Sequence, residues 1–158
     1  MKPIIRLRDV EPGDLPLFFE DQRDPEAVAM VVFKSRDRTA FDQHWAKLLA
    51  DYSCLAKTVL VDDKVAGNIG SWLSDGKREV GYWINRSYWG RGVATEALSA
   101  FLLIEQTRPL YGGVAKHNAG SIRVLQKCGF TFLRSAEDES GEATTDSHVL
   151  LVLAATSG

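Results

Sequence analysis

The sequence predicts a mixed α/β (α+β) fold in a single domain that spans residues 1–158. Seven apolar segments of strand length alternate with segments of helical periodicity, which is the pattern of a sheet flanked by helices. Short turns rich in Asp, Gly and Ser join several neighbouring strand segments, as hairpins require. One strand also leads through a glycine-rich turn directly into a helix, which is typical of a ligand-binding α/β unit.

The N-terminal half begins with a strand at residues 4–8, where apolar and polar side chains alternate. The next predicted elements are three helices, at residues 12–21, 25–32 and 39–50. Thr39 and Asp42 are spaced as a capping pair at the start of the third helix. Two strands follow, at residues 55–61 and 65–73, and the turn between them is Asp62-Asp63-Lys64.

The C-terminal half supplies the remaining strands and two helices. A strand ends at Ile84, and the helix after the glycine turn is predicted to run to about Gln106. A short helix between Asn118 and Gly129 has both ends marked, because Asn suits an N-cap and Gly suits the left-handed position past a C-terminus. Strands are predicted at residues 110–115, 130–135 and 148–153, and the polar, acidic residues 137–147 form an exposed hairpin loop.

The composition is that of an ordinary globular chain. Hydrophobic residues make up 45% and charged residues 25% of the 158 residues, which is enough for a sizeable core. The net charge of −2 does not indicate binding to nucleic acid, and the sequence has no basic patch suited to a membrane surface. No secretory or membrane-spanning segment is evident, so the two cysteines are expected as free thiols in the cytoplasm.

The turn containing Gly90 and Gly92 is a candidate anion site. Glycines allow a sharp turn, and the first amides of the following helix have no partner within it and carry the positive end of its dipole. A diphosphate suits this position, although a tight connection without a ligand is the alternative interpretation of the same spacing. The turn is not a P-loop, and Thr95 stands where a dinucleotide fingerprint needs its third glycine.

Taken with the segments on either side, this turn resembles the GCN5-related N-acetyltransferase (GNAT) family. The family signature Gln/Arg-x-x-Gly-x-Gly/Ala is matched by Trp89-Gly90-Arg91-Gly92-Val93-Ala94, with Trp in the first place. Trp is usual in the branch that resembles the RimJ/RimL ribosomal-protein acetyltransferases, and the segments from Glu79 to Ile84 and from Asn118 to Gly129 fit the same branch. The resemblance implies a mostly antiparallel sheet of about seven strands whose two central strands splay apart.

The resemblance also implies acetyl-CoA as cosubstrate, with its pantetheine arm between the splayed strands and its pyrophosphate at the glycine turn. It assigns cofactor contacts to twelve residues: Trp83, Ile84, Asn85, Trp89, Gly90, Arg91, Gly92, Val93, Ala94, Thr95, Asn118 and Ser121. Other interpretations stay open, because Trp83 and Ile84 also suit a plain core, Asn118 suits capping alone and Arg91 suits a solvated charge.

The chemistry needs a neutral amine, a donor for the oxyanion and a proton for the departing thiolate. Many family members carry Tyr as the acid at the position of Leu125, so this chain needs another donor. The resemblance points to Ser121, against the alternative of a serine that only bonds the backbone at the helix N-terminus. Glu79 is the candidate base, against the alternative of a carboxylate paired with Lys77 or Arg78. His117 is a weaker candidate, because a lone loop histidine is more often solvated than catalytic.

The leading hypothesis is therefore direct acetyl transfer to a primary amine of a small molecule or a protein N-terminus. The alternatives are a CoA-binding regulatory module without turnover, which Leu125 suggests, and a transferase for a different acyl group. No His, Cys, Asp or Glu cluster has metal-ligand spacing, so no metal is expected. The resemblance adds a possible homodimer, and no nucleic acid or membrane partner is expected.

Overall fold

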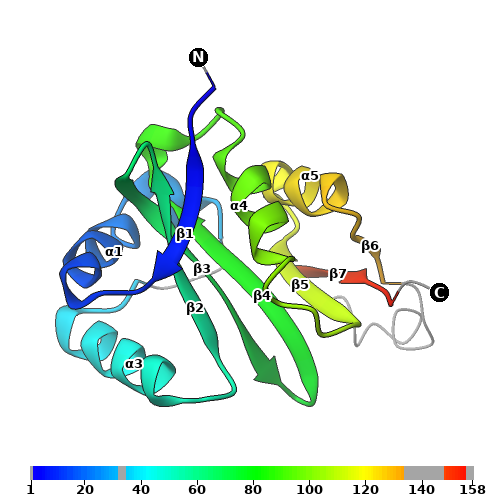
Figure 1. The fold of residues 1–158 in the computed structure, drawn as a ribbon, viewed down its shortest axis with the longest axis horizontal. Helices are drawn as coiled ribbons and strands as arrows, with labels where there is room; N and C mark the ends of the chain where they lie inside the picture. Colours follow the sequence, from blue (N-terminus) through cyan, green and yellow to red (C-terminus); the bar gives the residue numbers. More distant parts are fainter. Residues whose placement is uncertain (1, 32–34, 134–147, 156–158) are drawn as a thin grey trace.

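The computed structural model describes residues 2–31, 35–133 and 148–155, which form a sheet of seven strands flanked by helices (Figure 1). The strands lie in the order β1-β2-β3-β4-β5-β7-β6. Their bounds are β1 Ile5–Asp9, β2 Leu55–Val61, β3 Lys64–Ser74, β4 Lys77–Ile84, β5 Leu110–Ala115, β6 Thr131–Phe132 and β7 His148–Leu153. The predicted mixed α/β class with a seven-stranded sheet is confirmed.

The two central strands splay apart, as the family resemblance implies. All other neighbouring strands pair antiparallel, but β4 and β5 run parallel and share a single residue pair, Glu79 with Tyr111. Beyond this pair, β4 continues to Ile84 and β5 to Ala115 without further pairing to each other. One edge of each strand therefore faces a gap that widens toward the carboxyl ends of both strands.

The hairpin turn between β2 and β3 forms where the sequence predicts it, and a second hairpin turn joins β3 to β4. Asp62 and Asp63 take φ values of 48° and 67°, and Asp75 and Gly76 take 50° and 77°. Two central residues with positive φ make a turn whose twist matches that of the flanking strands, and Asp and Gly adopt this conformation at low cost. These turns fix the registers of β2 with β3 and of β3 with β4.

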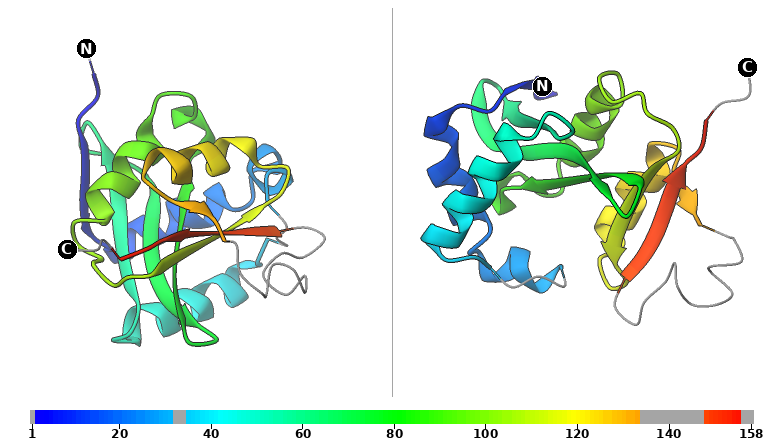
Figure 2. Two further views of the ribbon diagram at one scale, coloured as in Figure 1. Left: turned by 90° about the vertical axis from the view of Figure 1, so that its right-hand side faces the viewer. Right: turned by 90° about the horizontal axis from the view of Figure 1, so that it is seen from below.

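Helices cover both faces of the sheet (Figure 2). Helix α4 (Val93–Phe101) and helix α5 (Ala119–Lys127) bury the main core, which includes Val59, Ile69, Val80, Leu98 and Leu125. On the other face, α1 (Leu15–Asp21) and α3 (Arg38–Ala50) bury a smaller aromatic core of Phe18, Phe41 and Trp45. The short elements η1 (Pro12–Asp14), α2 (Pro25–Ala29) and η2 (Arg86–Tyr88) complete the described helices.

Two helix boundaries differ from the prediction. Helix α3 begins at Arg38, and the side chain of Asp37 accepts the amide of Ala40 at 2.8 Å, so the proposed cap of Thr39 with Asp42 is wrong. Helix α4 ends at Phe101 instead of near residue 106. The chain turns back there because Glu105 is buried, where it accepts hydrogen bonds from Ser71 and Arg78 at 2.6 Å each.

Other predicted elements are shorter, or lie outside the described residues. Helix α2 is described to Ala29, and residue 32 of its predicted span is not among the described residues. The strand predicted at residues 130–135 is reduced to β6 (Thr131–Phe132) within the described part. The acidic loop predicted at residues 137–147 lies outside the described residues.

Candidate active site

A cavity of about 570 Å³ lies at the splayed strands. Its wall is formed by the end of β4, the glycine turn, the first turns of α4 and α5, and α2. Ten of the twelve predicted cofactor residues line it: Trp83, Ile84, Trp89, Gly90, Gly92, Val93, Ala94, Thr95, Asn118 and Ser121. Sequence segments that lie far apart along the chain therefore meet in one cavity of cofactor size.

The glycine turn presents backbone amides to this cavity. Gly90 and Gly92 have φ values of 75° and 76°, a conformation that side chains with a Cβ rarely adopt. Gly92 is the N-cap residue of α4, so the amides that follow it lack partners within the helix. The positive end of the helix dipole adds to their attraction for an anion. The turn thus has the geometry of a phosphate site.

Two aromatic residues make contacts in this turn, and one of them bonds it to β4. The indole nitrogen of Trp89 donates to the carbonyl oxygen of Ile84 at 2.9 Å. The ring of Tyr88 lies under the guanidinium of Arg91, at 5.5 Å from Arg91 Cζ to the ring centroid. Arg91 is exposed and does not line the cavity itself, although it was predicted as a cofactor contact.

The peptide groups of β4 alternate in direction, and this alternation decides which of them face the gap. The carbonyl oxygen of Trp83 points at β3, since a Cβ built on Gly67 would lie 2.1 Å from it. Neighbouring residues of a strand point their peptide groups in opposite directions, so those of Tyr82 and Ile84 face the gap. Asn85 turns away, because its amide donates to Ala66 at 2.7 Å. Asn85, predicted as a cofactor contact, does not line the cavity.

Helix α5 brings Ser121 to the cavity. The side chain of Asn118 accepts the amide of Ser121 at 3.1 Å, which confirms the predicted N-cap. The hydroxyl of Ser121 lies 2.8 Å from the phenol oxygen of Tyr82. Leu125, one turn further along, is buried with both of its Cδ atoms 3.1 Å from the Cβ position of Gly112 on β5. Leu125 fills space at the floor of the gap and has no proton to give.

Glu79 lies on the opposite face of β4 from Ser121 and does not line the cavity. Side chains alternate along a strand, so Glu79 and Tyr82 point to different faces. Glu79 Oε1 lies 4.0 Å from the Cβ position of Gly113, which places the half-buried carboxylate against β5. Arg78 instead forms an ion pair with Glu105 at 2.6 Å, so the suggested pairing of Glu79 with Arg78 is wrong.

His117 and Cys128 have structural contacts. His117 Nε2 lies 2.7 Å from the carbonyl oxygen of Ala29, and this hydrogen bond ties the start of α5 to α2 across the cavity. Cys128 Sγ lies 3.7 Å from the carbonyl oxygen of Thr95 and 3.6 Å from Ser99 Oγ, in the contact between α5 and α4. These contacts give His117 a bridging position and Cys128 a packing position.

The sequence did not identify every residue that lines the cavity. Tyr82, Tyr88, Ala27, Met30, Arg123, Val124 and Lys127 line it as well. Arg123 and Lys127 are four residues apart on α5, and this spacing places two cations on one side of a helix. The spacing of Arg123 and Lys127 could have been recognised in the sequence. Nothing in the sequence around α2 indicated that Ala27 and Met30 would line the cavity.

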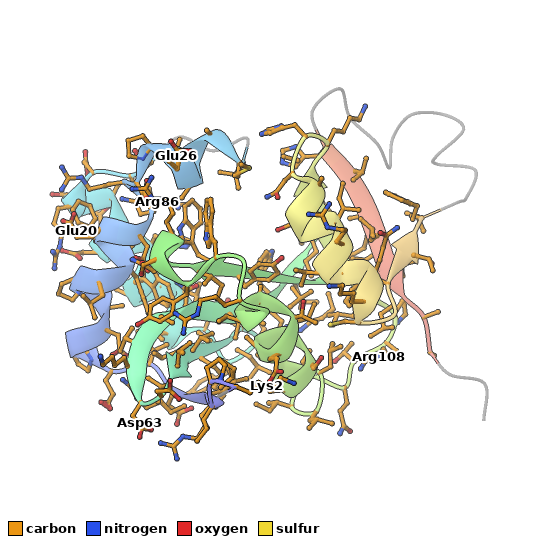
Figure 3. All side chains as sticks on the ribbon, turned by 90° about the horizontal axis from the view of Figure 1, so that it is seen from above. Lys2, Glu20, Glu26, Asp63, Arg86 and Arg108 are labelled. Atoms are coloured by element: carbon orange, nitrogen blue, oxygen red, sulfur yellow. The ribbon has the colours of Figure 1, made fainter. Side chains whose placement is uncertain are left out.

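A buried carboxylate anchors α1 to the end of β4. Asn85 Nδ2 donates to Asp21 Oδ1 at 2.6 Å, and Trp83 Nε1 donates to the backbone carbonyl of Asp21 at 3.1 Å. Burial raises the pKa of Asp21 to about 6, despite the hydrogen bond from Asn85. Arg86 pairs with Asp24 at 3.0 Å and lies beside α1 and α2, near the labelled Glu20 and Glu26 (Figure 3). These contacts set the position of α2 over the cavity.

A second cavity of about 680 Å³ lies between the sheet and helices α1 and α3. Its aromatic lining consists of Phe18, Phe41, His44, Trp45, Trp72 and Trp83. In the register of β3 with β4, Trp72 pairs with Glu79 and Asn68 with Trp83, so this cavity is on the same sheet face as Glu79. Trp83 lines both cavities and is therefore the point where they adjoin.

Two further findings concern metals and membranes. Within residues 2–31, 35–133 and 148–155, no group of three or more His, Cys, Asp or Glu side chains is arranged to hold a metal ion. Over the same residues, no helix has both the length and the apolar character needed to cross a bilayer.

Residues 5–131 match the family model described as an acetyltransferase (GNAT) domain, which is more than half of the chain. No curated protein sequence matches the chain.

Solved acetyltransferase structures share the fold. The spermidine N-acetyltransferase from Vibrio cholerae in complex with CoA and spermine matches with a TM-score of 0.78 at 15% identity, over 95% of each chain. An acetyltransferase from Thermus thermophilus matches with a TM-score of 0.78 at 19% identity, over 98% of this chain and 100% of that one. An aminoglycoside acetyltransferase in complex with coenzyme A and kanamycin matches with a TM-score of 0.77 at 16% identity, over 96% of this chain and 95% of that one.

Proposed function

The chain belongs to the GNAT family of acetyl-CoA-dependent N-acetyltransferases, and on that premise we propose that it transfers acetyl directly to a primary amine of a small molecule or a protein N-terminus. The observation that carries the proposal is the first cavity, which joins a helix N-terminus suited to an anion with the open edge of a splayed strand. A cosubstrate with a diphosphate at one end and an amide-bearing arm at the other fits that combination.

Each part of acetyl-CoA has a place in this proposal. The pyrophosphate accepts hydrogen bonds from the amides between Gly90 and Thr95. The pantetheine arm lies in the gap and pairs with the peptide groups of Tyr82 that face it, as an added strand would. Arg123 and Lys127 are available to the remaining phosphate. The thioester then lies near Ser121, on the α5 side of β4.

The two candidate catalytic groups lie on opposite faces of β4, and this suits a direct transfer. The amine approaches from the face of Glu79, which accepts its proton, and the thiolate leaves toward Ser121 on the other face. An α-amine has a pKa of about 8 and a lysine amine about 10.4, so the α-amine needs less help from a base near neutral pH. No enzyme nucleophile is needed on this route.

We place the body of the acceptor in the second cavity, because it adjoins the cofactor cavity at Trp83 and shares the face of Glu79. The indoles of Trp72 and Trp83 give it flat apolar walls that suit an acceptor with an apolar or aromatic part. The solved relatives that hold spermine and kanamycin are acetyltransferases with amine ligands, which supports the amine class for this chain too.

Three finer points of the proposal rest on the family resemblance. The RimJ/RimL-like branch is supported by Trp89 in the first place of the glycine-turn motif. One acetyltransferase domain over residues 1–158 is supported by a family match to residue 131 followed by β7 in the same sheet. A homodimer and a cytoplasmic location stay predictions of the resemblance alone.

The proposal is tested by thermal shift and thiol release with acetyl-CoA and an amine panel. The panel contains α-amino peptides, amino acids with apolar side chains, polyamines and aminoglycosides, and propionyl- and succinyl-CoA serve as alternative acyl donors. Stabilisation by acetyl-CoA, with thiol release on one amine class, supports the proposal and identifies the acceptor. Stabilisation without release on any amine favours the non-catalytic binding module, and faster release from another acyl-CoA favours a different acyl group. Absence of stabilisation refutes the cofactor assignment.

A further inference from the structure

The hydrogen bond between Tyr82 and Ser121 spans the two sides of the cofactor cavity. Tyr82 is on β4 and Ser121 is in the first turn of α5, 39 residues apart in the sequence. Their hydroxyl oxygens are 2.8 Å apart, and both side chains line the cavity. Leu125, on the next turn of the same helix, has no hydroxyl, whereas Tyr82 and Ser121 bring two bonded hydroxyls to the cavity wall.

Either hydroxyl of this pair can donate, since serine and neutral tyrosine each carry one proton and can each accept at oxygen. A phenol is more acidic than an alkyl hydroxyl, so Tyr82 is the better donor of the two. Burial raises the pKa of Tyr82, so the phenol stays protonated at neutral pH. When Tyr82 donates to Ser121 Oγ, the serine proton has to point elsewhere. The backbone amide of Ser121 is already bonded to Asn118, so the helix cap holds the hydroxyl at the cavity wall.

We propose that Tyr82 is a positioning residue for acetyl transfer, which donates to Ser121 Oγ and thereby directs the serine proton at the departing sulfur of CoA. The inference rests on the proposed function. It assigns the task that a helix tyrosine performs in many relatives to a pair formed by a strand residue and a helix residue. When Tyr82 donates to Ser121, the hydroxyl of Ser121 also becomes a stronger donor to sulfur, because each hydrogen bond polarises the next.

The proton balance of the step is complete without another reactant. The tetrahedral oxyanion collapses, the bond between carbon and sulfur breaks, and its electron pair goes to sulfur. The proton of Ser121 passes to the sulfur while the proton of Tyr82 passes to Ser121 Oγ. The amine loses one proton to Glu79 on forming the amide. Glu79 then releases this proton to solvent, and solvent returns one proton to Tyr82. The raised pKa of Tyr82 favours the return, since the buried phenolate is the less stable form.

The first experiment compares Tyr82→Phe with wild type in steady-state thiol release. The variant keeps the ring and removes only the donor, so we expect kcat to fall by about 10- to 100-fold, in the lower range of general-acid effects. The KM for acetyl-CoA should stay within about twofold, because the phenol is not assigned to cofactor binding. Tyr52→Phe is the matched control, since Tyr52 is fully exposed on the turn before β2, and its kcat should match wild type.

The second experiment is a double-mutant cycle with Ser121→Ala, which distinguishes positioning from simple packing. If Tyr82 acts through Ser121, Tyr82→Phe costs nothing further once Ser121 is Ala, and the solvent deuterium isotope effect on kcat is reduced equally in all three variants. A multiplicative loss in the double variant, or an unchanged kcat in Tyr82→Phe, overturns the inference while the proposed function stands. A wild-type protein that releases no thiol with any amine overturns both. Melting temperatures of each variant show that the comparison is made on folded protein.

Discussion

The indole nitrogen of Trp89 donates a hydrogen bond to the carbonyl oxygen of Ile84, 2.9 Å away. Ile84 is the last residue of β4, and Trp89 directly precedes the first glycine of the turn. The bond closes the chain between them into a loop and takes up a carbonyl that would otherwise face the gap. Trp89 thereby fixes the distance between the strand edge and the amides of the glycine turn.

Trp89→Phe keeps an aromatic ring and removes the indole donor. The loss of this bond should cost about 1 kcal/mol of unfolding free energy, because Ile84 keeps an unpaired carbonyl beside a cavity that water can enter. The affinity for acetyl-CoA should fall by about 5-fold, which corresponds to about 1 kcal/mol. Denaturant unfolding and calorimetric titration with acetyl-CoA measure the two effects separately. Unchanged cofactor affinity in Trp89→Phe would show that the turn holds its geometry without this bond.

Gly92→Ala tests the glycine turn through backbone strain alone. Gly92 has a φ of 76°, and a Cβ there would meet no atom within 4 Å, so the cost of alanine is conformational. We expect a loss of about 1–2 kcal/mol of unfolding free energy, and a KM for acetyl-CoA raised several-fold if the turn shifts to relieve the strain. Steady-state kinetics at saturating amine measures the change in KM.

Gly76→Ala is the matched control for this variant. Gly76 has a φ of 77° and equally open space, but it lies in the turn between β3 and β4, away from the cavity. Its stability loss should equal that of Gly92→Ala, and its KM should stay at the wild-type value. Equal KM values in the two variants would separate the glycine turn from cofactor binding.

Much of the fold was predictable because local chemistry decides it. Asp62 and Asp63 adopt positive φ in a two-residue turn, and Asn118 caps α5 with its own side chain, so both features were visible in a few neighbouring residues. The end of α4 was not visible in this way. Leu103 and Ile104 extend the apolar pattern but are 77% and 45% exposed, since Glu105 turns inward to Arg78 on β4.

The candidate site, like the fold, was predictable where it depends on neighbouring residues and not where it depends on residues far apart in the sequence. The turn from Trp89 to Thr95 is one continuous segment whose glycines and helix start identify an anion site. The partner of Ser121 is Tyr82, 39 residues away on a different element, and no periodicity relates the two. The cover of the cavity depends on Asp21 and Asn85, which bring α1 and α2 onto β4 through a hydrogen bond that only the folded chain contains.

Arg123 and Lys127 provide a charge test of the cofactor orientation. Both are exposed residues of α5 that line the cavity. If they hold the 3′-phosphate of CoA, Arg123→Gln with Lys127→Gln should weaken acetyl-CoA binding by about 10-fold at low salt, as expected for the loss of exposed charge pairs worth up to about 1 kcal/mol each. Binding of 3′-dephospho-acetyl-CoA should be unaffected by the same two changes.

The control for this prediction is Lys64→Gln, an exposed lysine at the start of β3 and away from the cavity. It changes the net charge without changing the cavity, so cofactor binding should match wild type. Titrations at low and high salt complete the comparison, since screening should reduce the difference between wild type and the double variant. An equal loss of affinity for both forms of CoA would place these side chains at a part of the cofactor other than the 3′-phosphate.

Asp21 should make the protein less stable as the pH rises toward neutrality. Burial raises its pKa to about 6 in the folded state, while an unfolded aspartate titrates near 3.9. A raised pKa means that the folded state binds the proton more tightly, so its stabilising effect is present below about pH 4 and is lost between pH 4 and 6. A difference of about two pKa units corresponds to about 3 kcal/mol, which the protein loses at pH 8 because the buried carboxylate is charged there.

Asp21→Asn removes the charge and keeps an oxygen that can accept the bond from Asn85. The variant should therefore unfold at higher denaturant than wild type at pH 8 and at a similar concentration at pH 4. Asp42→Asn, the exposed partner of Arg38, is the control and should show no such gain at pH 8. An advantage of Asp21→Asn that is equal at both pH values would attribute it to packing instead of charge, and would contradict the raised pKa.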